Sequence, residues 1–237
     1  MRRVVITGMG IYSCIGKNLK EVEQSLREGK SGIVLDPSRT EMGYRSSLVG
    51  LVEEPNLKGK LGRRQRITLS EQSKYAFVST EEALAVAGID QEYLTQKEAG
   101  IIFGNDSSAK AVIESIDIVR EKKDTTLLGS GSIFQSMNST VTMNLATIYK
   151  LKGINLTISA ACASGSHSIG LGFHLIASGL QEVVIAGGAQ EINPYAFGSF
   201  DGLGVFSMRQ DEPSKSCRPF DRDRDGLITS GGGATVI

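Results

Sequence analysis

Tryptophan is absent from this chain of 237 residues, histidine occurs only twice and cysteine three times. The three cysteines, Cys14, Cys162 and Cys217, are odd in number and form no CxxC pair. This pattern is poor material for a disulfide framework or a cysteine zinc site. Neither a metal nor another cofactor is predicted. A reducing cytoplasm is the expected location.

An excess of charge is also lacking, because 26 Lys+Arg balance 26 Asp+Glu. Binding to nucleic acid depends on a surplus of basic residues, so no nucleic-acid partner is expected. The longest uncharged stretch, residues 153–181, could span a bilayer by its length, but it contains several serines and glycines and both histidines. It is predicted to be a buried segment of a soluble protein rather than a membrane span. The N-terminus shows no export signal.

Apolar runs that end in glycine alternate with segments of helical periodicity along the chain. The predicted strands are residues 4–7, 99–104, 154–159, 182–186 and one strand within 227–237. The predicted helices are residues 17–29, 70–88, 136–152 and a segment that starts at Cys162 and includes the apolar residues 169–177; residues 31–66 are predicted to be irregular surface structure. This alternation indicates a single α/β domain with a mixed, largely parallel sheet covered by helices on both faces.

Two glycine motifs near the N-terminus resemble nucleotide-binding loops but are incomplete. Gly8 and Gly10 begin a GxGxxG motif, but Ser13 replaces its third glycine. A P-loop also fails, because five residues rather than four separate Gly10 from Gly16. The glycines are instead predicted to allow a tight turn between a strand and a helix.

Residues 221–226 match the first half of an EF-hand calcium loop. Gly232 stands where such a loop needs a bidentate glutamate, so calcium binding is not predicted. The aspartates of this segment are expected to pair with Arg222 and Arg224 instead.

Cys162 is the candidate nucleophile, because it follows a predicted strand, stands at the start of a segment predicted to be helical and has only small neighbours. A helix N-terminus stabilises a thiolate, and a strand-to-helix turn can direct backbone N–H groups at an oxyanion. The alternative is an inert core cysteine. His167 lies about 140° around the helix from Cys162 and His174 lies further along it. Neither is predicted to act as its base; His167 is expected to make a buried hydrogen bond and His174 a helix-packing contact.

Several segments together resemble one enzyme family. The runs RRVVITGMG, TISAACASGSHSIG, VVIAGGAQE, SFDGLGVFS and RPFDRDRDGLITSGGGATVI are similar to those of the β-ketoacyl-acyl carrier protein synthases, the decarboxylating condensing enzymes of fatty-acid synthesis. The similarity is greatest to the elongating synthases of the dissociated bacterial type. It implies a thiolase-like fold of two similar α/β halves, of which residues 1–237 form the N-terminal one, and a homodimer that uses the strand before the nucleophile.

The resemblance also assigns roles to individual residues. Cys162 matches the nucleophile that accepts an acyl chain from acyl carrier protein, and its N–H matches half of an oxyanion hole. Phe200 matches an aromatic residue of the acyl pocket. Ser107, with residues 105–106, matches the place where chain length is set, although the family more often has glycine or an aliphatic residue there. The basic residues that match the docking patch for the acidic carrier protein are Arg63, Arg64 and Arg66.

The remaining catalytic groups of the family do not occur in this sequence. Two histidines, a lysine and a phenylalanine belong to the family's C-terminal half, and the apolar end at Val236 and Ile237 is typical of truncation inside a strand. We therefore expect the 237 residues alone to accept an acyl or alkyl group but not to complete a condensation. The alternative is a non-catalytic partner similar to a chain-length factor, or a structural fragment.

Overall fold

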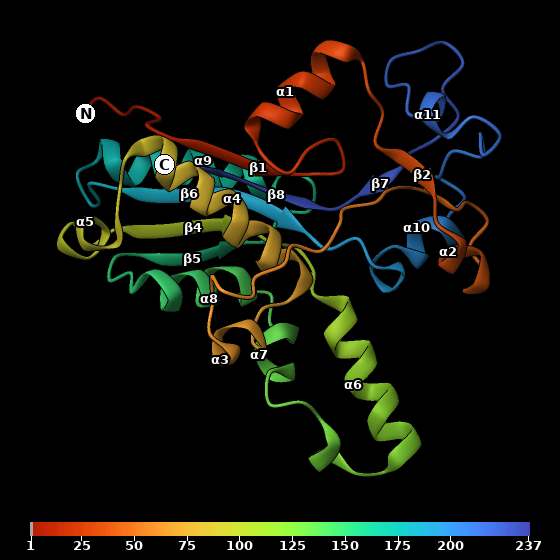
Figure 1. Ribbon diagram of the computed structural model, residues 1–237, viewed down its shortest axis with the longest axis horizontal. Coiled ribbons are helices and arrows are strands. Elements are labelled where there is room, and N and C mark those ends of the chain that lie inside the picture. The colour runs from red at the N-terminus through yellow and green to blue at the C-terminus, as the bar shows by residue number, and fades with distance from the viewer. Residues whose placement is uncertain (1) are drawn as a thin grey trace.

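A five-stranded sheet forms the centre of the chain in the computed structural model, which describes residues 2–237 (Figure 1). The strands, in spatial order, are β1 (Met9–Tyr12), β8 (Gly232–Val236), β6 (Val184–Gln190), β4 (Gly100–Gly104) and β5 (Asn155–Ile158). Strands β4, β5 and β6 pair in parallel, whereas β8 is antiparallel to both β6 and β1. Only β8 therefore runs against the other four strands, and the predicted mixed, largely parallel sheet is confirmed.

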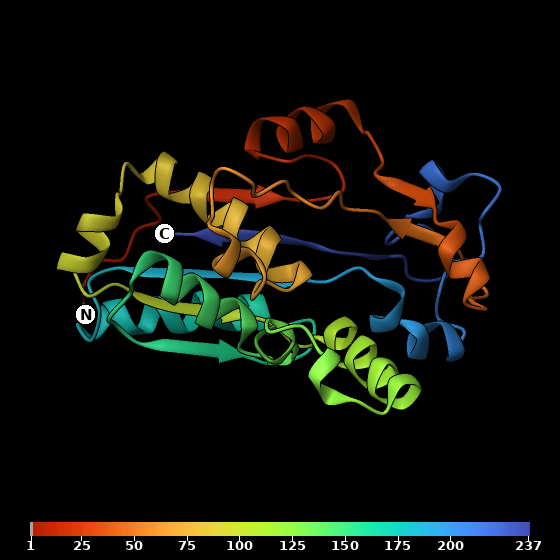
Figure 2. The same cartoon turned by 60° about the horizontal axis from the view of Figure 1, so that its bottom comes forward.

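Three long helices cover the two faces of this sheet. They are α4 (Glu71–Ala87), α8 (Thr140–Tyr149) and α9 (Ser164–Ala177). Ile101 and Phe103 of β4 pack into the large core with α4 and α8, whereas Ile102 between them packs with Val184 and Ala186 beneath α9. Because successive strand residues point to opposite faces, α9 covers the face opposite α4 and α8. Figure 2 shows α4 and α8 in front of the sheet and α9 behind it.

The predicted helices near the N-terminus are confirmed, with their expected ends. Helix α1 (Leu19–Glu28) begins after Asn18, whose side chain accepts the N–H of Glu21, and ends at Gly29 with φ of 63°. Helix α4 begins after Ser70 and ends at Gly88 with φ of 66°. A side-chain cap of this kind contributes about 1 kcal/mol, and glycine adopts the left-handed terminal conformation without strain.

The predicted strand over residues 4–7 is wrong, since the first strand is β1 and begins at Met9. Gly8 and Gly10 do not form a turn but lie directly against α4. A Cβ on Gly10 would lie 2.0 Å from the carbonyl oxygen of Ser79, and one on Gly8 would lie 2.1 Å from that of Ala83. The two glycines thus permit close packing of strand on helix, which accounts for them without a nucleotide.

Residues 31–66 contain more regular structure than predicted. They form β2 (Ile33–Leu35), α2 (Pro37–Glu41), β3 (Leu48–Gly50) and α3 (Arg63–Arg66). Strands β2 and β3 join β7 (Thr229–Ser230) in a small second sheet. Elements of three to five residues are too short for hydrophobic periodicity to reveal.

Helix α6 (Ala109–Lys122) was not predicted, and none of its residues is fully buried. It extends away from the sheet (Figure 1), and its apolar residues Val112 and Ile116 are 39% and 43% exposed, although they lie at helical spacing in the sequence. The predicted helix over 136–152 is α8, preceded by α7 (Ser132–Ser136), and β6 continues to Gln190, beyond the predicted 182–186. The other short elements are α5 (Gln91–Gln96), α10 (Gly198–Gly202), α11 (Pro213–Ser216) and two 3₁₀ turns, Thr125–Leu127 and Pro194–Ala196.

The uncharged stretch 153–181 forms strand β5 and helix α9, joined by a short turn. Some of its apolar residues pack on the sheet, as Leu175 of α9 does against Ile102. Leu156, Ile169 and Phe173 are 43–47% exposed, so the predicted burial of this segment is confirmed only in part. Within residues 2–237, no helix has both the length and the apolar character that crossing a bilayer requires.

Candidate active site

Cys162 lies in the turn between β5 and α9, as predicted, two residues before the first residue of the helix. Its side chain is exposed and its thiol is free, so the alternative of an inert core cysteine does not apply to this structure. Cys217, also free and exposed, follows the C-terminal end of the short helix α11, and Cys14 is half-buried. Only Cys162 combines exposure with a position just before the N-terminus of a long helix.

The turn that carries Cys162 is strained and is held by side-chain hydrogen bonds. Ala161 has φ of +48°, a left-handed conformation that costs a residue other than glycine about 1–2 kcal/mol. The hydroxyl of the buried Ser164 accepts the N–H of Ala160 at 2.9 Å and donates to the carbonyl oxygen of Ala161 at 2.6 Å. These bonds fix the backbone on either side of the strained residue and thus direct the Cys162 side chain outward.

Glycines let the start of α9 lie directly on the strand ends. A Cβ on Gly104, the last residue of β4, would lie 2.6 Å from the backbone N of Gly165. A Cβ on Gly188 of β6 would lie 3.2 Å from the Cα of the same Gly165. The small residues of the predicted nucleophile segment therefore serve to seat the helix, in addition to leaving the sulfur accessible.

A cavity of about 370 Å³ adjoins Cys162. Its walls come from the ends of β1, β6 and β8, from the Cys162 turn, and from Asp106, which follows β4. Ligands of open α/β sheets bind beyond the carboxyl ends of the parallel strands, and this cavity lies beyond those of β4 and β6. The size and position of the cavity thus suit a small ligand group that reaches the Cys162 sulfur.

Neither histidine lines this cavity. His167 is exposed, so the expectation of a buried hydrogen bond at this residue is wrong. His174 is also exposed and contacts the Phe173 ring edge-on, with 5.4 Å between ring centroids. Neither histidine therefore supplies a base for Cys162 in the cavity.

The segment after β4 brings Asp106, rather than Ser107, to the cavity wall. The Ser107 hydroxyl lies 3.4 Å from a carboxylate oxygen of Glu191 and accepts from Gln190 at 3.3 Å. Gln190 itself lines the cavity. The role of Ser107 in setting chain length stays a prediction; its side chain contacts the cavity-lining Gln190 but does not line the cavity itself.

Glu191 is a site residue that the sequence reasoning missed. Its carboxylate is 2% exposed and accepts the N–H of Ala109 at 2.6 Å, the N–H of Lys110 at 3.4 Å and the side-chain amide of Asn193 at 2.7 Å. A carboxylate at a helix N-terminus satisfies free N–H groups and interacts favourably with the helix dipole. Glu191 thus fastens the start of α6 to the end of β6, beside the cavity. In the sequence its only signal is an acid directly after a glycine-rich strand.

Phe200 is placed in α10, 44% exposed, where it stacks on Phe206 with 6.4 Å between ring centroids and lies near Phe197. It is not among the residues that line the Cys162 cavity. Its role in an acyl pocket therefore stays a prediction.

The three predicted docking arginines form helix α3 with Gln65. Arg63 and Arg64 are exposed, whereas Arg66 is half-buried and its Nε has no hydrogen-bond partner within residues 2–237. Between Glu54 and Glu71 the sequence has five basic residues and no acidic one, namely Lys58, Lys60, Arg63, Arg64 and Arg66. This segment is locally basic although the chain as a whole is neutral.

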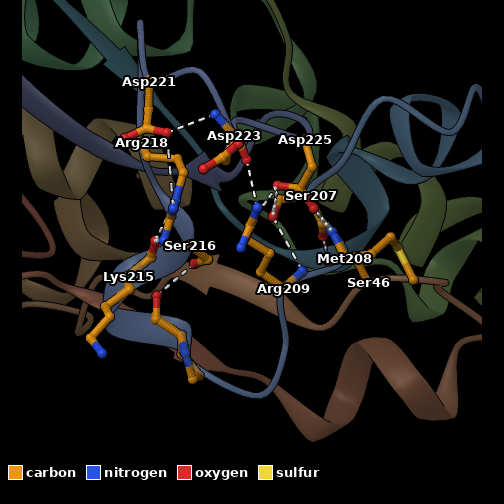
Figure 3. Close-up of polar contacts among 11 residues, drawn as sticks. Ser46, Ser207, Met208, Arg209, Lys215, Ser216, Arg218, Asp221, Asp223 and Asp225 are labelled. Carbon is orange, nitrogen blue, oxygen red and sulfur yellow. Dashed lines mark hydrogen bonds and ion pairs between the residues drawn. The ribbon is translucent and has the colours of Figure 1, made fainter.

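The aspartate-rich segment, residues 221–226, is held by hydrogen bonds to residues that precede it in the chain (Figure 3). Asp225 accepts the hydroxyl of Ser207 at 2.7 Å and the N–H of Met208 at 2.9 Å, and Arg209 Nε lies 3.6 Å away. Burial acts to raise the pKa of Asp225, but these hydrogen bonds and the arginine outweigh it and hold the pKa below its usual range. Asp225 is therefore a structural tie between two chain segments.

The expected pairing of Arg222 is confirmed, since it lies 3.5 Å from the Asp223 carboxylate. Arg224 instead donates to the main-chain carbonyl of Asp221. In the part of the chain that the structure describes, no group of three or more histidine, cysteine or acidic side chains is arranged to hold a metal ion.

Comparison with known proteins agrees with this geometry. The 3-oxoacyl-[acyl-carrier-protein] synthase 1 of Haemophilus influenzae is 38% identical over 239 residues, which cover 100% of this chain and 59% of that protein. A β-ketoacyl synthase structure from Burkholderia phymatum matches with a TM-score of 0.92 and 33% identity, over 100% of this chain and 58% of its own. The ishigamide ketosynthase/chain length factor matches with a TM-score of 0.86 and 26% identity, over 99% of this chain and 57% of its own.

The chain thus spans about 59% of the length of the Haemophilus influenzae relative. The family model described as "Beta-ketoacyl synthase, N-terminal domain" matches residues 1–237. The predicted family resemblance and thiolase-like fold are confirmed, and the chain belongs to the β-ketoacyl synthase family, whose N-terminal domain it carries.

Proposed function

We propose that the natural protein containing this chain is a 3-oxoacyl-acyl carrier protein synthase that elongates fatty acids. The observation that carries the proposal is the exposed Cys162, held on a strained turn before α9 and open to a cavity. The name of the Haemophilus influenzae relative, a 3-oxoacyl-[acyl-carrier-protein] synthase, supports the same reaction.

In the first half-reaction the Cys162 sulfur attacks the carbonyl carbon of an acyl thioester on the carrier protein. The carbon–sulfur bond to the carrier breaks, and the carrier thiol leaves with a proton. Cys162 then holds the acyl group in the cavity beside the turn. The small neighbours of Cys162 allow a carbonyl to approach the sulfur, and the resemblance assigns its N–H to the developing oxyanion.

In the second half-reaction a malonyl group loses CO₂, and its C2 carbon attacks the acyl carbonyl on Cys162. A carbon–carbon bond forms, the Cys162 sulfur leaves, and a 3-oxoacyl product remains on the carrier. The resemblance assigns the decarboxylation to two histidines outside residues 1–237. This assignment is consistent with the absence of His167 and His174 from the cavity wall.

We also propose a homodimer in which β5 lies at the interface. Strand β5 is at the edge of the sheet, and its Leu156 is 44% exposed. An exposed apolar edge strand is a ready template for pairing with a second chain.

The test of the function is synthesis of a 3-oxoacyl product from acyl and malonyl carrier proteins, measured by mass spectrometry. We expect the natural protein to form product. The 237-residue chain alone should take up the acyl group on Cys162 and form no product, and condensation by this chain would contradict the proposal. A natural protein that never becomes acylated at Cys162 would support the alternative of a non-catalytic partner similar to a chain-length factor.

Carrier-protein docking gives a second prediction. Reversing both exposed charges with Arg63→Glu and Arg64→Glu should raise the KM for acyl carrier protein about tenfold and change kcat little, because interface charges mainly govern encounter and orientation. The wild-type KM should rise with ionic strength, and the variant's should rise less. Lys20→Glu, an exposed charge reversal on α1, is the control and should leave KM unchanged. An unchanged KM in the double variant would remove α3 from the docking surface.

A further inference from the structure

Asp106 connects the end of β4 to the turn that carries Cys162. Its Oδ1 accepts the hydroxyl of Ser159 at 2.6 Å and the backbone N–H of Ala161 at 3.2 Å. Ser159 follows β5, and Ala161 directly precedes Cys162. One carboxylate oxygen thus binds both ends of the three-residue segment before the nucleophile.

The hydrogen bond to Ala161 falls on the strained residue itself. Ala161 has φ of +48°, and such a conformation persists only where the surroundings hold it. Ser164 holds the segment from the helix side, through the N–H of Ala160 and the carbonyl oxygen of Ala161. Asp106 holds it from the strand side, through the N–H that Ser164 does not contact. The two side chains therefore act on different backbone groups of the same turn.

We propose that Asp106 is a positioning residue for Cys162, which holds the nucleophile turn in its strained conformation through the Ser159 hydroxyl and the Ala161 N–H. The inference rests on the proposed function, in which Cys162 accepts the acyl group. Asp106 does not bond to the reacting sulfur and acts through the backbone of residues 159–161.

Because of the position of Asp106, the strength of its hydrogen bonds to the turn depends on whether substrate is bound. Asp106 is exposed and lines the Cys162 cavity. An acyl group in the cavity displaces water from around the carboxylate, and hydrogen bonds strengthen where water is excluded. The turn is thus held most firmly when the acyl group is present, which is when the geometry of the sulfur and its carbonyl matters.

The experiment compares Asp106→Ala with Asp106→Asn in the natural protein containing this chain. The asparagine side chain keeps an oxygen acceptor in the place of Oδ1, whereas alanine removes it. We expect Asp106→Ala to lower kcat for acyl transfer about tenfold or more with KM changed less than twofold, since misplacing a reacting group lowers the rate of the chemical step. Asp106→Asn should restore kcat to within about threefold of wild type.

Two further variants isolate the hydrogen bonds. Ser159→Ala should lower kcat less than Asp106→Ala, and the double variant should be no slower than Asp106→Ala alone, because both side chains act through one carboxylate oxygen. Asp124→Ala is the matched control, since its Oδ1 likewise accepts an N–H and a hydroxyl, both from Thr126, just beyond the far end of α6. It should leave kcat unchanged.

Amide hydrogen exchange at Ala161 provides a readout that does not depend on synthase activity. Exchange should accelerate at least about tenfold in Asp106→Ala and remain near wild type in Asp106→Asn. If the wild-type protein transfers no acyl group, the proposed function is wrong. Amide exchange at Ala161 would then still test whether Asp106 holds the turn. A kcat of Asp106→Ala within twofold of wild type, equal losses in the alanine and asparagine variants, or unchanged exchange at Ala161 would overturn the inference.

Discussion

Replacing Cys162 with alanine in the natural protein should lower condensation by at least about 10³-fold and abolish the acylated intermediate, because the proposed mechanism holds the acyl group on the Cys162 sulfur. Intact-mass measurement after incubation with acyl carrier protein reports the intermediate directly. Cys162→Ala should show no mass increase, and product formation should fall to the background level. The fold should be unaffected, since the Cys162 side chain is exposed.

Cys217→Ala is the control for this prediction. Cys217 is equally free and exposed but follows the C-terminal end of α11, where backbone carbonyls rather than N–H groups face outward. Its replacement should leave acylation and condensation at wild-type levels. Iodoacetamide should also inactivate wild-type protein in step with modification of Cys162, not of Cys217. Acylation that persists in Cys162→Ala, or that is lost in Cys217→Ala, would contradict the assignment of the nucleophile.

Local patterns were enough to predict the elements on which the site is built. Helix α4 follows from a capping Ser70, an apolar repeat and a terminal Gly88, and β4 follows from a short run of buried residues that ends at Gly104. The placement of Cys162 between a strand and a helix was predicted in the same way. These features depend on neighbours within a few residues, and such neighbours are visible in the sequence.

The contacts that shape the site depend on residues far apart in the chain, so no local pattern reveals them. Asp106 binds the turn at Ala161 and Glu191 binds the start of α6, and each pair is separated by more than fifty residues. The prediction that Gly10 belongs to a turn is wrong because the residues it packs against are in α4, far away in the sequence. Resemblance to a family did not help at residues 105–107, because the polar side chains of this chain differ from the residues that the family usually has there.

The second substitution with a large expected effect, on both stability and acyl transfer, is Gly104→Ala. Alanine there would place its Cβ 2.6 Å from both the N of Gly165 and the carbonyl carbon of Ser164, and 2.9 Å from the Ser164 Cβ. Unstrained contacts between such atoms are about 3.4 Å or longer, and backbone atoms of a helix cannot rotate away as a side chain does. Gly104→Ala therefore requires the first turn of α9 to move off the strand end.

This overpacking should destabilise the fold by about 3 kcal/mol, measured as a shift in the midpoint of denaturant unfolding. Acyl transfer should fall by about 10²-fold under conditions where the variant is still folded, because the displaced first turn carries Ser164, which holds the Cys162 turn. Gly202→Ala is the matched control, since a Cβ on Gly202 would meet nothing within 4 Å. It should leave both stability and acyl transfer near wild type. Wild-type acyl transfer in folded Gly104→Ala would show that the contact between β4 and α9 does not set the position of Cys162.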